Sequence, residues 1–254
     1  MIVFQTIAVA FGMFSALPVP RFEWDSRNMR YALCAFPLVG LACGGLWCLC
    51  GAACGALGLP GPVQDAAYCL VPVAVTGGIH LDGYADTADA LASYGSREKK
   101  LEILKDSHAG AFAILMGCCY FVLDYGVFHA TDLRAIRLLA IGYVLSRAFS
   151  GLAIVVFKKA RKSGLAATFS DSAQKKTVAV TMILYIAACA VLMVLTDPVI
   201  GSLCFLTALL VFGWYRYMSY QKFGGITGDL AGFFLQVCEL AMAFVTVIAI
   251  HLIG

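Results

Sequence analysis

The chain is a succession of long apolar runs separated by short polar connections. An apolar run of about 17 to 25 residues is long enough to cross a bilayer as a helix. Seven runs are expected to span: residues 32–59, 63–81, 110–130, 134–157, 177–195, 198–214 and 230–253. An eighth, marginal run at the N-terminus, residues 2–17, either spans the bilayer or lies along its interface. The pattern predicts an all-α, polytopic integral membrane helix bundle of about seven transmembrane helices and an N-terminal membrane-associated helix.

The composition supports a membrane protein and argues against a soluble domain. Hydrophobic residues make up 61% of the chain and charged residues only 13%, whereas soluble domains carry about 25% charged residues. No linker or change of composition divides the chain, so we expect one integral membrane domain over residues 1–254. No internal repeat is evident, which disfavours a transporter built from inverted repeats.

The basic residues predict the orientation of the helices. Of the 18 Lys and Arg residues, 15 lie in four loops: residues 18–31, 82–109, 158–176 and 215–229. By the positive-inside rule these loops face the cytoplasm. We therefore expect a multi-pass protein of the cell (inner) membrane, with catalytic loops near residues 80–110 and 215–229 on the cytoplasmic side. The net charge of +3 suits anionic headgroups or phosphorylated substrates, and nothing supports nucleic-acid binding.

The most acidic stretch of this apolar chain is residues 80–89, HLDGYADTAD. Asp82, Asp86 and Asp89 stand at i, i+4 and i+7, so in a helix they share one face. Three like charges repel one another unless a cation lies between them, and oxygen ligands suit Mg²⁺. We expect these aspartates to bind Mg²⁺; the alternative is a solvated helix face. His80 is a candidate general base, metal ligand or substrate hydrogen-bond donor, or a structural interfacial histidine.

A second polar motif precedes the next predicted span. Residues 105–110 read KDSHAG, and Lys105 and Asp106 are expected at the same membrane depth as the acidic stretch. The loop 158–176 is basic and rich in small residues. It either closes over an anionic ligand or only fixes the topology through its positive charge.

A third polar motif, residues 224–229, reads GGITGD. Backbone amides around its glycines can form a nest that binds an anion, with Gly225, Thr227 and Gly228 as the candidate phosphate contacts. Asp229 leads into the last predicted span. The motif is therefore expected to bring an anion site and a further carboxylate to the cytoplasmic face.

Charged residues are also expected inside the membrane, besides Asp65 and Asp124, which lie within the membrane or near its interface. Glu239 lies within the last predicted span, and Arg147 lies well inside its own. A charge at this depth is costly and by default marks a functional site. Arg147 is expected either to pair with Glu239 or to bind a substrate phosphate. Together with the three motifs, Arg147 supplies the groups that phosphoryl transfer requires, namely carboxylates for a metal and cations for phosphate.

The three motifs, in this order, resemble those of the cobalamin synthase family, whose members are adenosylcobinamide-GDP ribazoletransferases. Residues 36–40 (FPLVG) and 18–21 (PVPR) resemble the family as well, so the likeness extends over nearly the whole chain. Ala90 and Ala113 stand where glycine would be expected, a small change that leaves the carboxylates in place.

The resemblance implies a reaction, a cofactor and partners. Adenosylcobinamide-GDP and α-ribazole, or its 5′-phosphate, would give adenosylcobalamin, or its 5′-phosphate, and GMP, with Mg²⁺ as cofactor. A ribose hydroxyl of α-ribazole would attack the phosphate linked to cobinamide. The lipid bilayer would surround the enzyme. Contacts with other late enzymes of corrinoid synthesis, and a homo-oligomeric state, are left open.

The resemblance also suggests roles for the polar residues. The three aspartates of the acidic stretch would hold Mg²⁺ at the pyrophosphate. Asp229 and Asp106 would complete the site or orient the attacking hydroxyl. Lys105 and Arg147 would neutralise phosphate charge, and His80 would be a candidate base.

Two other functions are also consistent with the sequence. The acidic stretch resembles CDP-alcohol phosphotransferases, lipid enzymes that displace CMP at an acidic metal site, although Asp86 stands where they place Arg. A cation transporter could use the same carboxylates as an ion pathway. It predicts acidic residues at mid-membrane depth on several spans.

Overall fold

The computed structural model describes residues 2–20, 22, 26–106 and 108–253. Within these ranges the regular elements are helices, and the strand-like pairing is confined to one bridge between Lys159 and Ile226. The predicted all-α class is therefore confirmed. Arg21 and Ser107, which belong to two of the family-like motifs, lie outside the described residues.

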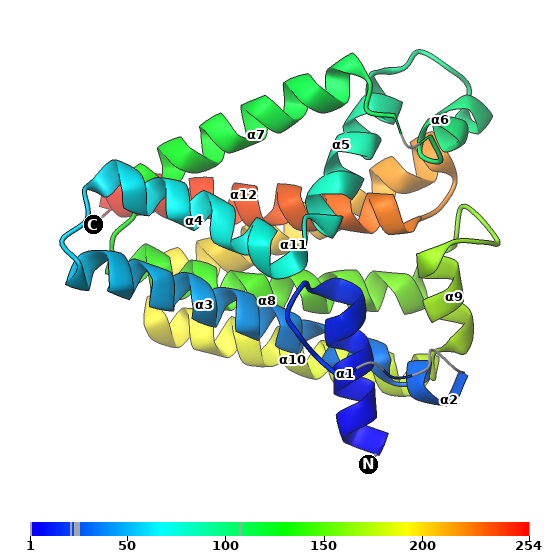
Figure 1. Cartoon of the computed structure of the whole chain (residues 1–254), viewed down its shortest axis with the longest axis horizontal. Helices are drawn as coiled ribbons and strands as arrows, with labels where there is room; N and C mark the ends of the chain where they lie inside the picture. Colours follow the sequence, from blue (N-terminus) through cyan, green and yellow to red (C-terminus); the bar gives the residue numbers. More distant parts are fainter. Residues whose placement is uncertain (1, 21, 23–25, 107, 254) are drawn as a thin grey trace.

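The helices follow one another with short connections, and α8 lies at the centre of the bundle, packed against α3, α10 and α12 (Figure 1). The bounds are α1 (Ile2–Phe14), α2 (Ser26–Met29), a 3₁₀ turn (Ala32–Ala35), α3 (Phe36–Ala56), α4 (Gly61–Thr76), α5 (Ile79–Ala92), α6 (Arg97–Ile103), α7 (Ala111–His129), α8 (Leu133–Val156), α9 (Leu165–Ser172), α10 (Lys175–Thr196), α11 (Pro198–Phe223) and α12 (Gly228–Ile253).

Six helices of the described chain are long and apolar enough to cross a membrane: α3 with its 3₁₀ turn, α7, α8, α10, α11 and α12. They coincide with six of the seven strong apolar runs. The seventh run, residues 63–81, is divided between α4 and the start of α5. With 16 residues, α4 is about 24 Å long, shorter than the roughly 30 Å hydrocarbon core. The protein is a multi-pass membrane protein, and α4 is a shorter helix of its bundle.

Two glycines divide that seventh run. Gly77 and Gly78 have φ angles of +65° and +78°, in the left-handed region that glycine enters without steric cost. The amide of Gly78 donates to the carbonyl of Val73 (3.0 Å), which closes the end of α4. Helix α5 then leaves in a different direction (Figure 1). The acidic stretch therefore lies on a separate helix rather than at the end of a span.

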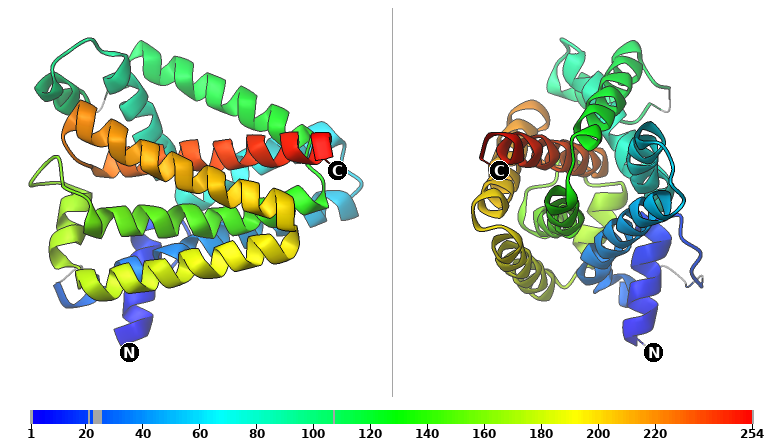
Figure 2. Two further views of the ribbon diagram at one scale, coloured as in Figure 1. Left: turned by 180° about the vertical axis from the view of Figure 1, so that it is seen from behind. Right: turned by 90° about the vertical axis from the view of Figure 1, so that its left-hand side faces the viewer.

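The N-terminal helix α1 runs across the long helices rather than alongside them (Figure 1, Figure 2). Its 13 residues extend about 20 Å, too short for the hydrocarbon core. Val3 and Phe4 are exposed, whereas Val9 and Phe14 are buried against the bundle. Of the two arrangements left open by the sequence, this geometry matches a helix that lies along the interface.

Glycines also let α3 approach the central helix closely. A Cβ atom on Gly44 would lie 2.7 Å from the carbonyl oxygen of Ala140, and one on Gly40 would collide with that of Tyr143. Small residues at such positions allow two membrane helices to pack backbone against backbone. A larger side chain at either glycine would push α3 away from α8.

The polar segments gather at one end of the bundle. Figure 2 shows α6, α9, the end of α11 and the start of α12 at this end, and the turn between α10 and α11 at the other. The loops 82–109, 158–176 and 215–229 therefore lie on the same side, as the distribution of basic residues predicts.

Candidate active site

Helices α5 and α12 cross at two glycines. A Cβ atom added to Gly83 would lie 2.7 Å from the carbonyl oxygen of Asp229, and one added to Gly232 would lie 2.9 Å from that of His80. The backbones approach this closely because neither residue has a side chain. The crossing brings the acidic stretch of α5 beside Asp229 at the start of α12.

The carboxylates around this crossing form a cluster with little compensating charge. Partial burial, followed by the negative charges of Asp82, Asp229, Asp89 and Asp106, raises the pKa of Asp86 to about 6. Among the described residues, Asp229 is the one carboxylate of the five that has an Arg or Lys partner, Arg161 at 4.0 Å. Like charges held together in this way favour a cation between them.

Asp89 and Asp106 lie at the edges of this cluster. The carboxylate of Asp89 lies against the Cα atom of Gly110, where any Cβ would collide with its oxygens. The amide of His108 donates to Asp106 (3.0 Å), and His108 Nδ1 lies 2.7 Å from the same carboxylate oxygen. These hydrogen bonds hold the pKa of Asp106 below its usual range. Asp106 is therefore an exposed, ionised group at the rim.

A polar cavity of about 220 Å³ adjoins the cluster. Lys105, Arg161 and Asp229 contribute charged side chains to its wall, and Ser163 and Thr227 contribute hydroxyl groups. Lys105 and Asp229, both predicted as site residues, are thus brought together. Two cations beside a carboxylate cluster form a suitable setting for a phosphate group that also binds a metal.

The GGITGD segment does not form the predicted anion-binding nest. Its amides at Gly224, Gly225 and Ile226 donate to backbone carbonyl oxygens at 3.1, 3.2 and 2.8 Å. An amide bonded in this way is not available to an anion. The nest prediction is therefore wrong for these three amides, Gly225 included. Gly225 instead makes room for a neighbouring loop, because a Cβ there would collide with the carbonyl oxygen of Lys158.

Thr227 and Gly228 begin helix α12. Thr227 Oγ1 accepts a hydrogen bond from the amide of Leu230 (3.2 Å), as an N-cap residue does, and it donates to Asp229 Oδ2 (3.2 Å). Amides in the first turn of a helix have no acceptor within that helix. The phosphate contacts assigned to Thr227 and Gly228 stay predictions. A phosphate bound there would lie at the N-terminus of α12 instead of in a loop nest.

Arg147 does not reach the site as a phosphate ligand. Its side chain is 1% exposed, and Nη1 donates to Glu239 Oε1 (2.7 Å) and to the carbonyl of Tyr143 (2.9 Å). Ser146 Oγ donates to the same oxygen of Glu239 (2.6 Å). Of the two partners that the sequence left open, the structure selects Glu239, because α8 and α12 pack together inside the bundle. Arg147 Nη1 is therefore paired within the protein, although Arg147 Nε has no hydrogen-bond partner among the described residues.

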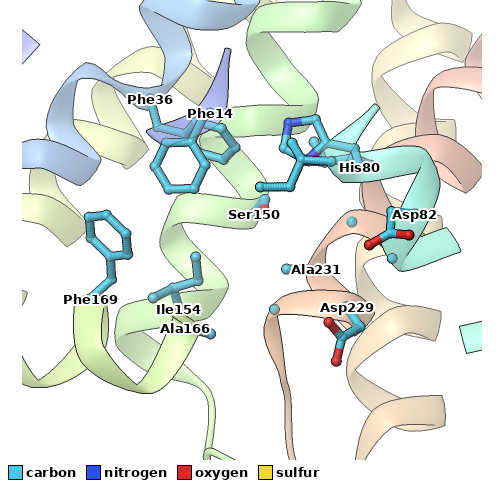
Figure 3. Close-up of a pocket in the computed structure, with 15 residues that line it drawn as sticks. Phe14, Phe36, His80, Asp82, Ser150, Ile154, Ala166, Phe169, Asp229 and Ala231 are labelled. Atoms are coloured by element: carbon cyan, nitrogen blue, oxygen red, sulfur yellow. The ribbon is translucent and has the colours of Figure 1, made fainter. Parts of the chain in front are cut away.

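A second cavity of about 220 Å³ also borders Asp229 (Figure 3). Asp82 and Asp229 lie at one side of it, whereas the imidazole of His80 lies towards Phe36, with 5.9 Å between the ring centroids. His80 is 5% exposed, and no described residue hydrogen-bonds to its Nε2 atom. His80 therefore lines the cavity and is set apart from the carboxylates.

The donor set around Asp86 fits Mg²⁺, although not as a finished three-carboxylate site. Among the described residues, no three carboxylate, imidazole or thiol groups converge closely enough to hold a metal by themselves. Mg²⁺ does not require such a cage, since it usually binds one or two carboxylates together with waters and substrate phosphates. The all-oxygen donors and their unbalanced charge suit that kind of binding. Mg²⁺ at this cluster stays a prediction.

For some residues of this site the sequence indicated no role. Arg161 was included only as one charge of the loop 158–176, and its signal is its place in a basic segment directly after a span. The aromatic residues Phe14, Phe36 and Phe169 line the second cavity from α1, α3 and α9. Nothing in the local pattern links these three residues, because their contact arises from tertiary packing alone.

Six long apolar helices, with carboxylates and cations gathered at one end, define a multi-pass membrane protein that carries the groups needed for phosphate chemistry. The family model described as cobalamin-5-phosphate synthase matches residues 6–247. The chain therefore belongs to the cobalamin-5-phosphate synthase family, and the resemblance carried by its motifs is confirmed.

Several relatives match along nearly their whole length, and each is named adenosylcobinamide-GDP ribazoletransferase. The relative from Lachnoclostridium phytofermentans is 45% identical over 245 residues, which cover 96% of this chain and 94% of the relative. The relatives from Clostridium perfringens and Geotalea daltonii are each 32% identical over 244 residues. The first match covers 94% of this chain and 95% of the relative, and the second covers 95% of this chain and 96% of the relative. No solved structure matches this chain.

Proposed function

We propose that this protein is an adenosylcobinamide-GDP ribazoletransferase, which attaches the nucleotide loop in cobalamin synthesis. It joins adenosylcobinamide-GDP to α-ribazole, or its 5′-phosphate, and releases GMP. The observation that carries the proposal is a family match along residues 6–247 in a chain whose carboxylate cluster adjoins two cations. The two alternative functions lack such support. The family match is neither to CDP-alcohol phosphotransferases nor to a cation transporter, and the mid-membrane Glu239, which an ion pathway could use, is paired with Arg147.

In this transfer one P–O bond forms and one breaks. The ribose hydroxyl oxygen of α-ribazole bonds to the phosphorus atom that is attached to cobinamide. The bond from this phosphorus to the bridging oxygen of the pyrophosphate breaks, and GMP leaves with that oxygen. The hydroxyl proton passes to a carboxylate. Asp229 is the candidate acceptor, because it lines both cavities.

The cations of the polar cavity would bind the pyrophosphate. Lys105 and Arg161 line that cavity together, and there they would neutralise the charge that develops on departing GMP. Thr227 and Gly228, at the start of α12, would add hydrogen bonds to a phosphate oxygen. Most of the rate enhancement in such a site comes from positioning and from charge neutralisation.

Asp82 and Asp86 would hold Mg²⁺, with Asp89 and Asp106 adding negative charge at the edges. When bound, Mg²⁺ neutralises phosphate oxygens and orients them for an in-line displacement. The unbalanced charge around Asp86 supports this assignment.

We further propose that the site faces the cytoplasm from the cell (inner) membrane. The loops that carry most of the basic residues lie at the same end of the bundle as the aspartates, and basic loops favour the cytoplasmic side. Soluble substrates would then reach the site without crossing the bilayer.

The test is GMP release by the purified protein supplied with both substrates and Mg²⁺. Release should require each of the three. Asp82→Asn should remove most of the turnover, and His80→Gln should cost less. Asp132→Asn is a matched control, because Asp132 caps α8 at the opposite end of the bundle and asparagine caps helices equally well. No release by the wild type would refute the proposed activity, and full turnover in Asp82→Asn would refute the metal assignment.

A further inference from the structure

The cavity beside Asp82 and Asp229 has an aromatic wall (Figure 3). The ring centroid of Phe14 lies 4.3 Å from that of Phe36 and 5.2 Å from that of Phe169. These rings come from three different helices and meet at one side of the cavity. A planar aromatic ligand placed there would contact ring faces and edges, an arrangement that stabilises aromatic pairs beyond the burial of their surface.

Two buried polar atoms of the same cavity have no hydrogen-bond partner among the described residues. They are His80 Nε2 and Ser150 Oγ, on residues that are 5% and 1% exposed. A buried polar atom without a partner is unfavourable. A ligand that brings a matching polar atom removes this penalty, so the two atoms favour a largely apolar ligand with one or two polar positions.

The two cavities differ in character and share part of their walls. Ala166, Gly228 and Asp229 line both of them. Aromatic rings lie on one side of this shared wall, and Lys105 and Arg161 lie on the other. A ligand that extends from a neutral ring system towards a phosphate would therefore have the sugar between them at Asp229.

We infer that the apolar cavity binds the 5,6-dimethylbenzimidazole base of α-ribazole, with the Ser150 hydroxyl donating to the ring nitrogen that carries no ribose. This inference rests on the proposed function and assigns the two substrates to separate cavities. The attacking hydroxyl is on the ribose attached to this base. Binding of the base among the rings therefore brings that hydroxyl to Asp229 and Asp82.

The other substrate fits this cavity poorly. Guanine carries several donors and acceptors along its edge, and those left without partners in an apolar wall would oppose binding. A corrin ring is too large for a cavity of about 220 Å³. Dimethylbenzimidazole has a single free nitrogen and otherwise apolar edges, which matches the wall that the structure provides.

The first experiment measures KM for each substrate in Ser150→Ala. Loss of one neutral hydrogen bond should raise KM for α-ribazole about tenfold and leave KM for adenosylcobinamide-GDP unchanged. Ser219→Ala is the matched control, because Ser219 Oγ is also buried without a partner but lies outside the cavity. It should change neither constant.

A second experiment changes the ligand instead of the protein. In an α-ribazole analogue with indole as its base, carbon replaces the ring nitrogen that carries no ribose. Wild-type protein should show the same tenfold rise in KM with this analogue, and Ser150→Ala should show no additional rise, because both changes remove one hydrogen bond. Phe36→Leu should also raise KM for α-ribazole, whereas Phe149→Leu, a buried phenylalanine outside the cavity, should not.

The outcomes separate this inference from the activity on which it rests. Absence of GMP release from wild-type protein overturns the proposed function. Wild-type turnover with an equal rise of both KM values in Ser150→Ala, or with no rise, overturns the inference alone. The same holds if the indole analogue binds the wild type as tightly as α-ribazole does.

Discussion

Two carboxylate-bearing regions of this protein treat negative charge in opposite ways. In the middle of the bundle, Glu239 accepts hydrogen bonds from Arg147 (2.7 Å) and Ser146 (2.6 Å), and the ion pair is buried. At one end of the bundle, the aspartates around Asp86 repel one another, and among the described residues only Asp229 has an Arg or Lys partner. Glu239 therefore has a cationic partner within the protein, whereas most of the aspartates around Asp86 have no Arg or Lys partner among the described residues.

This difference shows that depth in the membrane does not by itself identify the functional charges here. Arg147 and Glu239 are the deeper residues, yet they satisfy each other and join α8 to α12. The cluster on α5 lies at the end of the bundle, where repulsion is retained and a cation or phosphate can enter. Unbalanced charge, rather than burial, marks the candidate site.

The largest expected effect comes from breaking the buried pair. Glu239→Leu leaves the guanidinium of Arg147 without its partner and should lower the free energy of unfolding by about 3–5 kcal/mol. The measurement is thermal unfolding of the detergent-solubilised protein. Combining Glu239→Leu with Arg147→Met should restore much of the lost stability, because the double variant buries neither charge of this pair. A stable Glu239→Leu protein that cannot release GMP would instead indicate that Arg147 acts on the substrate.

A smaller effect, on activity alone, is expected at the unbalanced cluster. Asp86→Asn should lower GMP turnover at least about 100-fold, since even groups that only hydrogen-bond to metal ligands contribute about 10–100-fold. Its fold should persist, because no described cation depends on this carboxylate. Turnover assays at several Mg²⁺ concentrations check the effect. Wild-type rates in this variant would show that the Asp86 carboxylate, and its repulsion of the neighbouring aspartates, is not required for catalysis.

The cation beside Asp229 should matter less than the aspartates. Arg161→Ala should raise KM for adenosylcobinamide-GDP about tenfold, through loss of one charge-assisted contact to phosphate. Lys162→Ala, an exposed neighbour in the same loop, is the control and should leave KM unchanged. Equal effects of the two substitutions would indicate that the loop acts only through its overall charge.

The smallest effect concerns stability and pH. Because the pKa of Asp86 rises from 3.8 to about 6 on folding, the folded state binds the proton more tightly than the unfolded chain does. Without divalent cations, stability should therefore increase as the pH falls from about 6 towards 3.8.

Asp86→Asn should accordingly stabilise the cation-free protein well above pH 6 by about 1 kcal/mol, a value that allows for solvent screening at this partly exposed site. The advantage should disappear near pH 3.8 and on addition of Mg²⁺. Thermal unfolding at the two pH values checks both points. A variant less stable than wild type above pH 6 would mean that Asp86 is not under electrostatic strain.

The helical fold could largely be predicted from the sequence, because the length of an apolar run is a local property. Six of the seven strong runs are long apolar helices. The break at Gly77 and Gly78 could not be located, since residues 63–81 are apolar on both sides of it. The direction of α1 was also left open, because it depends on packing against the bundle.

The candidate site was predictable where one helix carries it and not where distant segments meet. Spacing alone places Asp82, Asp86 and Asp89 on one stripe of α5. The nest prediction failed in part because the amide of Ile226 donates to Lys158, a residue far away in the sequence; the amides of Gly224 and Gly225 donate to carbonyls of the preceding helix. The choice between phosphate and Glu239 as partner of Arg147 likewise required the packing of α8 against α12.

The apolar cavity also determines when during its synthesis the enzyme can become active. Phe14 lies on the first described helix, and Asp229 and Leu235 lie on the last, α12. A nascent chain stalled before α12 enters the membrane would have neither this cavity nor the partner of α5 at Gly83. Earlier helices can insert and begin to pack as they leave the ribosome. The catalytic pocket, however, is assembled in one late event, so incomplete translation products should be inert rather than partly active.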